Sequence, residues 1–151
     1  MDIFNQNAVK RVFKIKGRNF KKPISIMVSS IAEIKKLAYL NKKQEEVVKN
    51  LLPGPFTVIL KKKKIVSDLI TAGSWKVGVR IPDSKFCQKL AKNLPITTTS
   101  ANLSGQKPTL NFKKLIKIFD KKNVLIVKGR NLSGKPSTVI DLTVDPPEIL
   151  R

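Results

Sequence analysis

The chain has 151 residues, 41% hydrophobic and 27% charged, which fits one domain with a sizeable core and argues against a disordered or membrane-spanning protein. Histidine is absent and Cys87 is the single cysteine, so the sequence argues against a zinc site, an internal disulfide and an imidazole base. The first residues lack the pattern of a secretory signal, and we expect a cytoplasmic protein without a membrane partner. The 31 Lys and Arg against 10 Asp and Glu give a net charge of +21, which favours a polyanionic partner such as RNA, DNA or a nucleotide.

The first half of the chain predicts three helices and three strands, assigned from apolar spacing and turn residues. The helices are expected at residues 6–16, from a cap at Ser29 or Ser30 to 38, and from a cap at Asn41 to 52. The strands are expected at residues 23–28, 56–60 and 75–81, with a solvated lysine hairpin or loop at 61–64. One apolar face of each helix should lie in the core.

In the second half of the chain, predicted helices and strands again alternate. A helix is expected from Asp83 or Ser84 to 93, with Phe86, Leu90 and Ala91 buried. The remaining elements are a strand at 95–99, a polar loop at 100–109, a helix carrying residues 112–119, and strands at 124–127 and 138–142. Strands that alternate with helices indicate an undivided α/β domain with a mostly parallel or mixed sheet.

Two polar loops resemble each other, at residues 102–109 and 131–138. Each contains Asn, Ser, Gly and Lys, residue types that provide backbone amides, hydroxyls and charge for an anion. Neither has the spacing of a P-loop, and each is also compatible with an ordinary turn. We expect two similar loops at one end of a sheet.

The positive charge is mostly lysine, which fits either a nucleic-acid surface or a lysine-rich composition spread over solvent-facing positions. The five arginines are therefore more informative. The pair Lys16 and Arg18 flanks a glycine between a helix and a strand, which suits either a helix C-terminus or a phosphate. Arg80 ends an apolar strand, so it must pair with a buried carboxylate or face an anionic ligand.

Six blocks of the chain resemble the YrdC-like domain, the catalytic core of L-threonylcarbamoyladenylate synthase. The Lys-x-Arg at Lys16 and Arg18 and the Ser-x-Asn at Ser100 and Asn102 are similar to the signature of that family. The blocks fall at residues 16–24, 52–57, 77–82, 98–105, 136–141 and 148–151. Their order and approximate spacing agree over essentially the whole chain.

The resemblance implies one YrdC-like domain over residues 1–151, with a twisted mixed sheet, helices packed around it and a concave basic cleft. A block of the type Pro-Thr-(Asp/Glu)-Thr-Val-Tyr-Gly-Leu, which the family carries before the first helix, is absent. We therefore expect the chain as written to be either a fragment or a degenerate homologue that lacks the first strand and turn, with reduced activity.

The resemblance also implies the reaction. L-Threonine, bicarbonate or CO₂, and ATP as a substrate with Mg²⁺ on its phosphates, would give L-threonylcarbamoyl-AMP and pyrophosphate. The product would serve threonylcarbamoyl modification of the tRNA adenosine beside the anticodon, through downstream transfer proteins. An inactive homologue that binds tRNA or double-stranded RNA is the alternative. A carbamoyl-transfer module of the hydrogenase-maturation type is disfavoured, because the zinc-finger cysteines of those proteins are absent.

The residue roles follow from position within the matching motifs, and the resemblance implies no protein metal ligand. Lys16 and Arg18 are expected at the ATP phosphates, with Ser100 and Asn102 on nucleotide or carbamate; these four form the catalytic set. Arg151 is expected to reach the nucleotide. Threonine is expected to contact Arg80 through its carboxylate, with Ser137, Thr98 and Thr57 nearby. Thr57 and Thr98 are equally compatible with ordinary strand positions.

Overall fold

The computed structural model describes residues 1–129 and 135–151. Its helices are α1 (Gln6–Lys16), α2 (Ile31–Leu37), α3 (Lys42–Leu51), α4 (Asp68–Thr71), α5 (Lys85–Ala91) and α6 (Phe112–Phe119), with a 3-10 turn η1 (Asp120–Lys122) after α6. Its strands are β1 (Ser25–Met27), β2 (Phe56–Lys61), β3 (Lys76–Arg80), β4 (Ile96–Thr98), β5 (Thr138–Asp141) and β6 (Glu148–Ile149).

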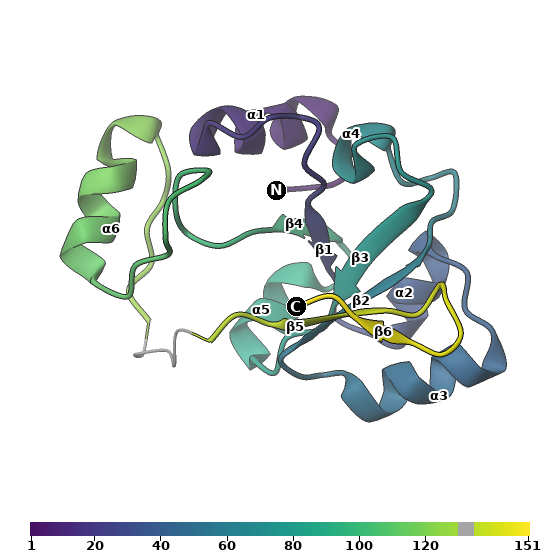
Figure 1. Cartoon of the computed structure of the whole chain (residues 1–151). Helices are drawn as coiled ribbons and strands as arrows, with labels where there is room; N and C mark the ends of the chain where they lie inside the picture. Colours follow the sequence, from purple (N-terminus) through teal and green to yellow (C-terminus); the bar gives the residue numbers. More distant parts are fainter. Residues whose placement is uncertain (130–134) are drawn as a thin grey trace.

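The strands form one sheet in the order β4-β1-β3-β2-β5-β6 (Figure 1). β1 runs parallel to β3 and β2 parallel to β5, whereas the other neighbouring pairs are antiparallel. This arrangement confirms the predicted α/β class with a mixed sheet. No helix in the described parts of the chain is long and apolar enough to cross a membrane.

Local signals start and stop the helices where the sequence predicts. Ser30 caps α2 by accepting from the backbone N–H of Glu33, and Asn41 forms a reciprocal capping box with Gln44 at the start of α3. Gly17 ends α1 in the left-handed region, with φ of 58°, and its N–H donates to the last carbonyls of the helix. The left-handed turn directs the chain after α1 toward Arg18.

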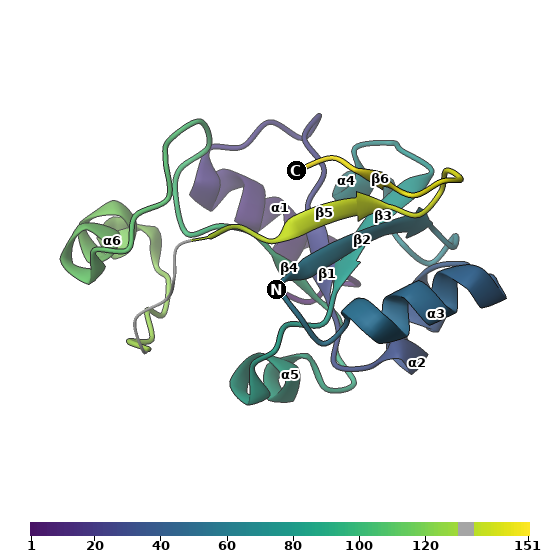
Figure 2. The ribbon, with the colours of Figure 1, turned by 60° about the horizontal axis from the view of Figure 1, so that its bottom comes forward.

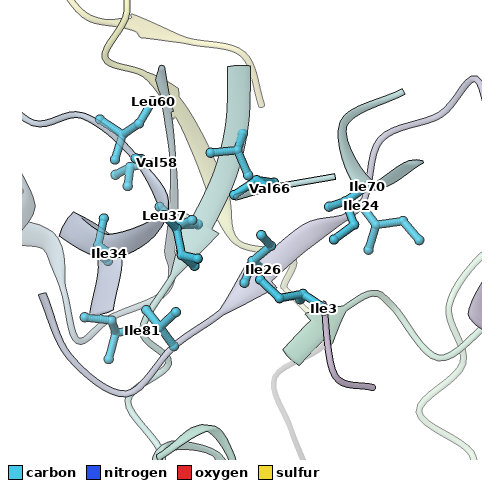
Figure 3. Close-up of a cluster of buried hydrophobic side chains, with 14 of the residues drawn as sticks. Ile3, Ile24, Ile26, Ile34, Leu37, Val58, Leu60, Val66, Ile70 and Ile81 are labelled. Carbon is cyan, nitrogen blue, oxygen red and sulfur yellow. The ribbon is translucent and has the colours of Figure 1, made fainter. Parts of the chain in front are cut away.

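The two faces of the sheet differ in chemistry because side chains alternate along each strand. On one face Val58, Leu60, Val77 and Val79 are at most 2% exposed. They join a core to which α2 also contributes; Figure 3 shows Ile34 and Leu37 beside Val58. In Figure 2, α2 and α3 lie together on one side of the sheet.

The alternate positions of the same strands carry Thr57 and Ile59 on β2 and Lys76, Gly78 and Arg80 on β3. Around Thr57, Gly78 and Arg80 the opposite face is therefore polar and small. The register places Val58 opposite Val79, which puts Thr57 and Arg80 on this second face. We call it the polar sheet face. It presents residues that the sequence analysis selected as ligand contacts.

The predicted burial of Phe86 and Leu90 is wrong. These side chains are 59% and 52% exposed, and only Ala91 of α5 reaches the interior. α5 lies at the periphery of the fold (Figure 2), so no neighbouring element covers its apolar side. Helical spacing shows that a helix has an apolar face but not that something packs on it.

The predicted strand at 124–127 is also wrong, because this segment has no regular structure. Leu125 is 89% exposed, and none of the strands in residues 1–129 and 135–151 pairs with this segment. α6 and this segment extend away from the sheet (Figure 1). Residues 131–134 of the second polar loop lie outside the described residues, so the expected placement of both loops at one end of the sheet stays a prediction.

Candidate functional site

Lys16, the last residue of α1, is buried and binds the loop that follows β4. Its Nζ donates to the carbonyl oxygens of Ser100 (2.5 Å) and Asn102 (2.6 Å) and to Oδ1 of Asn102 (3.3 Å). An ammonium has three donors, so all of them are directed at this loop. Burial lowers the pKa of Lys16, and repulsion from Arg18 lowers it further.

The loop itself is held by Asn102, which is 8% exposed. Ser100 Oγ donates to Oδ1 of Asn102 at 2.5 Å, and Nδ2 of Asn102 donates to the carbonyl oxygen of Gln106 at 2.5 Å. The backbone N–H of Ser104 donates to the carbonyl oxygen of Lys16 at 2.8 Å. Three of the four predicted catalytic residues therefore form one hydrogen-bonded cluster, although more than 80 residues separate Lys16 from the loop.

Arg18 is half-buried and directed at its own turn. Its Nε and one terminal nitrogen donate to the carbonyl oxygens of Lys22 (3.2 Å) and Pro23 (2.8 Å). Burial lowers its pKa. None of the ion pairs within the described residues involves Lys16 or Arg18, so two neighbouring cations lie at the end of α1 without a carboxylate to neutralise them.

A second group lies on the polar sheet face where β2 and β5 begin. Thr57 Oγ1 and Ser137 Oγ are 3.0 Å apart, which joins β2 to the residue before β5. β6 pairs with β5 and thereby places Arg151 here, with a guanidinium nitrogen 3.3 Å from the carbonyl oxygen of Ser137. Thr57, Ser137 and Arg151, which were predicted separately, are thus neighbours.

Arg80 is next to this group at the end of β3. Its Nε is buried and has no hydrogen-bond partner within the described part of the chain. Burial lowers the pKa of Arg80; Cys87 opposes this effect, and the nearby charge of Arg151 adds to it. Arg80 and Arg151 repel each other, and the buried N–H of Arg80 lacks an acceptor. A bound anion would reduce this repulsion and accept a hydrogen bond from that N–H.

Ser25 and Gly78, which the sequence analysis did not select, lie between the two groups. Ser25 pairs with Thr98 across β1 and β4. A Cβ built on Gly78 would be 3.3 Å from Ser25 Oγ and 3.4 Å from Thr57 Cγ2, so these side chains pack closely around the glycine and leave little room for a larger residue. The alternation of small and polar residues on β1 and β3 could have indicated both positions once the strand order was known.

The described cavities lie elsewhere. One of about 210 Å³ is lined by α3 and residues 142–147, and a shallow one of about 380 Å³ lies beside Tyr39 and Trp75. Neither is lined by the predicted site residues. No group of three His, Cys, Asp or Glu side chains within the described residues could hold a metal ion. The candidate site is therefore a polar sheet face bordered by cations.

Comparison with known proteins agrees with this arrangement. The sequence profile of a family described as telomere recombination, comprising Sua5, YciO and YrdC, matches residues 1–151. The chain belongs to the Sua5/YciO/YrdC family.

A putative threonylcarbamoyl-AMP synthase of Methanocaldococcus jannaschii is 39% identical over 93% of this chain and 67% of that protein. The human threonylcarbamoyl-AMP synthase is 31% identical over 91% of this chain and 52% of its own length. A crystal structure of Pyrococcus abyssi Sua5 complexed with L-threonine has a TM-score of 0.91 at 35% identity, covering 99% of this chain and 45% of that one. This Sua5/YciO/YrdC chain thus spans about half to two thirds of these relatives.

Proposed function

We propose that this chain takes part in forming L-threonylcarbamoyl-AMP from L-threonine, bicarbonate or CO₂, and ATP. The observation that carries the proposal is the site at Arg80 and Arg151, where two arginines face a polar sheet without a carboxylate partner in the described residues. The names of the synthase relatives and the threonine complex of Pyrococcus abyssi Sua5 support it. These names favour a synthase over the alternative of an inactive RNA-binding homologue.

Arg80 is proposed to bind the threonine carboxylate. A guanidinium offers parallel N–H donors that match the two carboxylate oxygens, and the unpaired Nε of Arg80 is one such donor. Thr57 and Ser137 lie beside it and offer hydroxyls to the amine or hydroxyl of threonine. Thr98 lies farther along the same sheet face, beside Ser25.

Arg18 and the cluster of Lys16, Ser100 and Asn102 are proposed to bind ATP. Arg18 brings a cation to the phosphates, and backbone amides of the loop after β4 supply donors. The Ser100 hydroxyl donates to Asn102 and thereby holds this loop in shape. Lys16 contributes its charge while holding the loop in place, because its three donors are already engaged with Ser100 and Asn102. Arg151 lies at the other border and is proposed to reach the nucleotide.

The chemistry needs no histidine. The threonine amine adds to CO₂ and loses a proton, giving a carbamate; a carbamate oxygen then bonds to the α-phosphorus while the bond to pyrophosphate breaks. The residues present act by positioning the two substrates and by neutralising negative charge on phosphate and carboxylate. Mg²⁺ would be held by phosphate oxygens, since the side chains around the proposed site are cationic or neutral.

The product, threonylcarbamoyl-AMP, is proposed to be consumed by a second protein. Threonylcarbamoyl-AMP is an activated carbamoyl donor, so a transferase must carry the group to a nucleophile, which we propose to be the tRNA adenosine beside the anticodon. We expect these steps in the cytoplasm. tRNA would then be a substrate of the next protein, whether or not it also touches this chain.

Pyrophosphate release tests the proposed function. It should require L-threonine, bicarbonate and ATP together, and the product should have the mass of threonylcarbamoyl-AMP. Arg80→Lys keeps the charge but loses the parallel donors, so the KM for threonine should rise at least tenfold while that for ATP changes little. Arg11→Lys, at an exposed position of α1, is the matched control. Pyrophosphate release at the same rate with and without L-threonine would contradict the proposal.

A further inference from the structure

The lysine run at residues 61–64 and the single tryptophan, Trp75, have no role in the proposed site. The structure brings them together with a second aromatic residue, Tyr39. Tyr39 and Trp75 are 54% and 55% exposed, although both are large aromatic side chains that ordinarily lose most of their exposure on folding. Both rings are therefore accessible to a partner that stacks on aromatic side chains.

Backbone hydrogen bonds fix the two rings near each other. The N–H of Tyr39 donates to the carbonyl oxygen of Lys61, and the N–H of Lys62 donates to that of Trp75, each at 2.9 Å. Lys61 is also paired with Lys76 across β2 and β3. Tyr39, Lys61 and Trp75 line the shallow cavity of about 380 Å³, together with Asn41 and Gln44.

Lysine ammonium groups surround both rings. Those of Lys61 and Lys63 lie 5.7 and 5.4 Å from the centre of the Tyr39 ring, and that of Lys76 lies 4.9 Å from the centre of the Trp75 ring. We call Tyr39, Trp75, Lys61, Lys63 and Lys64 the aromatic–lysine surface. It combines two exposed aromatic rings with ammonium groups that lie over them. A base that stacks on a ring would take the place of such an ammonium, which the flexible lysine side chain can move to a phosphate.

The charge of this surface is not balanced locally. Asp68 pairs with Lys62 at 2.5 Å and Asp141 with Lys76 at 2.7 Å. Within the described residues no carboxylate lies at ion-pair distance from Lys61, Lys63 or Lys64. Lys63 donates to the carbonyl oxygen of Lys35 at 2.6 Å, which holds its ammonium without neutralising the charge. The positive charge of the three lysines thus attracts an anionic partner, and salt should weaken that partner's binding.

We propose that the aromatic–lysine surface binds a single-stranded segment of nucleic acid. Unpaired bases would stack on Tyr39 and Trp75 while the lysines contact the phosphates, the combination by which single strands are bound without base-edge readout. A duplex offers the same phosphates but keeps its bases stacked internally, and an acidic peptide offers charge without flat bases. The surface lies at the Lys76 end of β3, four residues and about 13 Å from Arg80, so it is separate from the proposed threonine site.

Trp75 reports on this binding directly, because it is the only tryptophan in the chain. Titration with an oligouridylate of about 12 nucleotides, a length within the range of single-strand sites, should quench its fluorescence in a saturable way. An oligothymidylate of the same length compares DNA with RNA, and the tighter of the two identifies the source. Failure of both to quench, or equal quenching by an RNA duplex or by oligoglutamate, would overturn the proposal.

Variants assign the binding to individual residues, with a labelled oligouridylate followed by fluorescence anisotropy. Tyr39→Ala should weaken binding about fivefold or more, the loss expected for one stacked base. Lys61→Ala with Lys64→Ala should lower the slope of log K against log salt by about 1.4, or about 0.7 for each phosphate contact. Lys113→Ala with Lys114→Ala removes two exposed lysines of α6 and is the matched control. Equal losses in the lysine pair and its control would mean nonspecific attraction and reject the surface.

Discussion

Replacement of Lys16 by methionine separates two roles that its position permits, that of a phosphate ligand and that of a clamp on the loop after β4. Methionine keeps most of the side-chain length but removes the ammonium that donates to Ser100 and Asn102 at 2.5, 2.6 and 3.3 Å. Lys16 is only 4% exposed and Asn102 8%, so the carbonyl oxygen of Asn102 left behind would be shielded from water. The variant therefore tests the clamp directly.

The expected cost can be worked out from these contacts. The carbonyl oxygen of Ser100 keeps the backbone N–H of Asn102 as a donor at 3.0 Å, so the carbonyl oxygen of Asn102 is the acceptor that loses its donor. A buried acceptor left without a donor costs about 1–3 kcal/mol. Removal of the buried ammonium, whose pKa is lowered by burial, offsets part of that loss, so we expect a cost of about 1–2 kcal/mol. For a chain of this length each kcal/mol shifts Tm by about 2–4 °C, which predicts a fall of about 2–8 °C.

Thermal unfolding followed by circular dichroism measures this shift, and calorimetric titration measures ATP affinity in parallel. Lys14→Met is the matched control, because Lys14 is on the same helix and exposed. We expect Lys16→Met to lower both Tm and ATP affinity and Lys14→Met to change neither appreciably. Unchanged Tm with lost ATP affinity would refute the clamp and make Lys16 a direct phosphate ligand.

Three further predictions concern other parts of the fold. Gly78→Val should push Ser25 and Thr57 apart and weaken threonine binding at least tenfold in calorimetric titration, and the crowding should also lower Tm. Arg18→Ala should weaken ATP binding about tenfold or more, measured in the same way, because a charged phosphate contact is lost. Glu33→Gln should flatten the acid side of the stability curve measured by urea unfolding at a series of pH values.

The contacts of Glu33 determine whether its ionisation stabilises or destabilises the fold as the pH falls. Burial alone would raise its pKa, but hydrogen bonds from the N–H groups of Ser29 (2.7 Å) and Asn93 (2.9 Å) and from the Ser29 hydroxyl (3.0 Å) outweigh burial and lower it. The unfolded chain then takes up the proton first, so this stability is complete above the ordinary carboxylate pKa of about 4 and is lost as the pH falls below it. Glu46→Gln, at an exposed position, should leave the curve unchanged.

Each of these predictions has a result that would contradict it. Threonine affinity that survives Gly78→Val would show that the ligand does not depend on the positions of Ser25 and Thr57 around this glycine. Arg11→Ala, which removes an exposed arginine of α1, is the control for Arg18→Ala. Equal ATP affinities of these two variants would remove Arg18 from the nucleotide site. An acid limb as steep in Glu33→Gln as in the wild type would mean that another carboxylate governs acid unfolding.

The sequence predicted those features that depend on local signals. Ser30 and Asn41 started helices because their side chains satisfy free backbone N–H groups, a property visible in the sequence itself. Phe86, Leu90 and the segment 124–127 were predicted wrongly because burial and strand formation depend on a neighbouring element. Apolar and β-branched patterns carry no information about whether that neighbour exists.

The residues of the candidate site also fall into those that sequence motifs indicate and those that depend on the fold. The motifs identified Lys16, Ser100 and Asn102, which the structure joins by hydrogen bonds, and Thr57 and Ser137, which it places 3.0 Å apart. Ser25 and Gly78 could not be selected, since their place between the two groups depends on the order of strands in the sheet. The engagement of all three donors of Lys16 likewise follows from tertiary contacts alone.

The central claim is that Arg80 binds the carboxylate of threonine. Calorimetric titration with L-threonine and with L-threoninol, which keeps the amine and the side chain but lacks the carboxylate, tests it most directly. The account predicts that L-threonine binds at least tenfold more tightly than L-threoninol and that Arg80→Gln removes the difference. Equal affinities for the two ligands in the wild-type chain would contradict it.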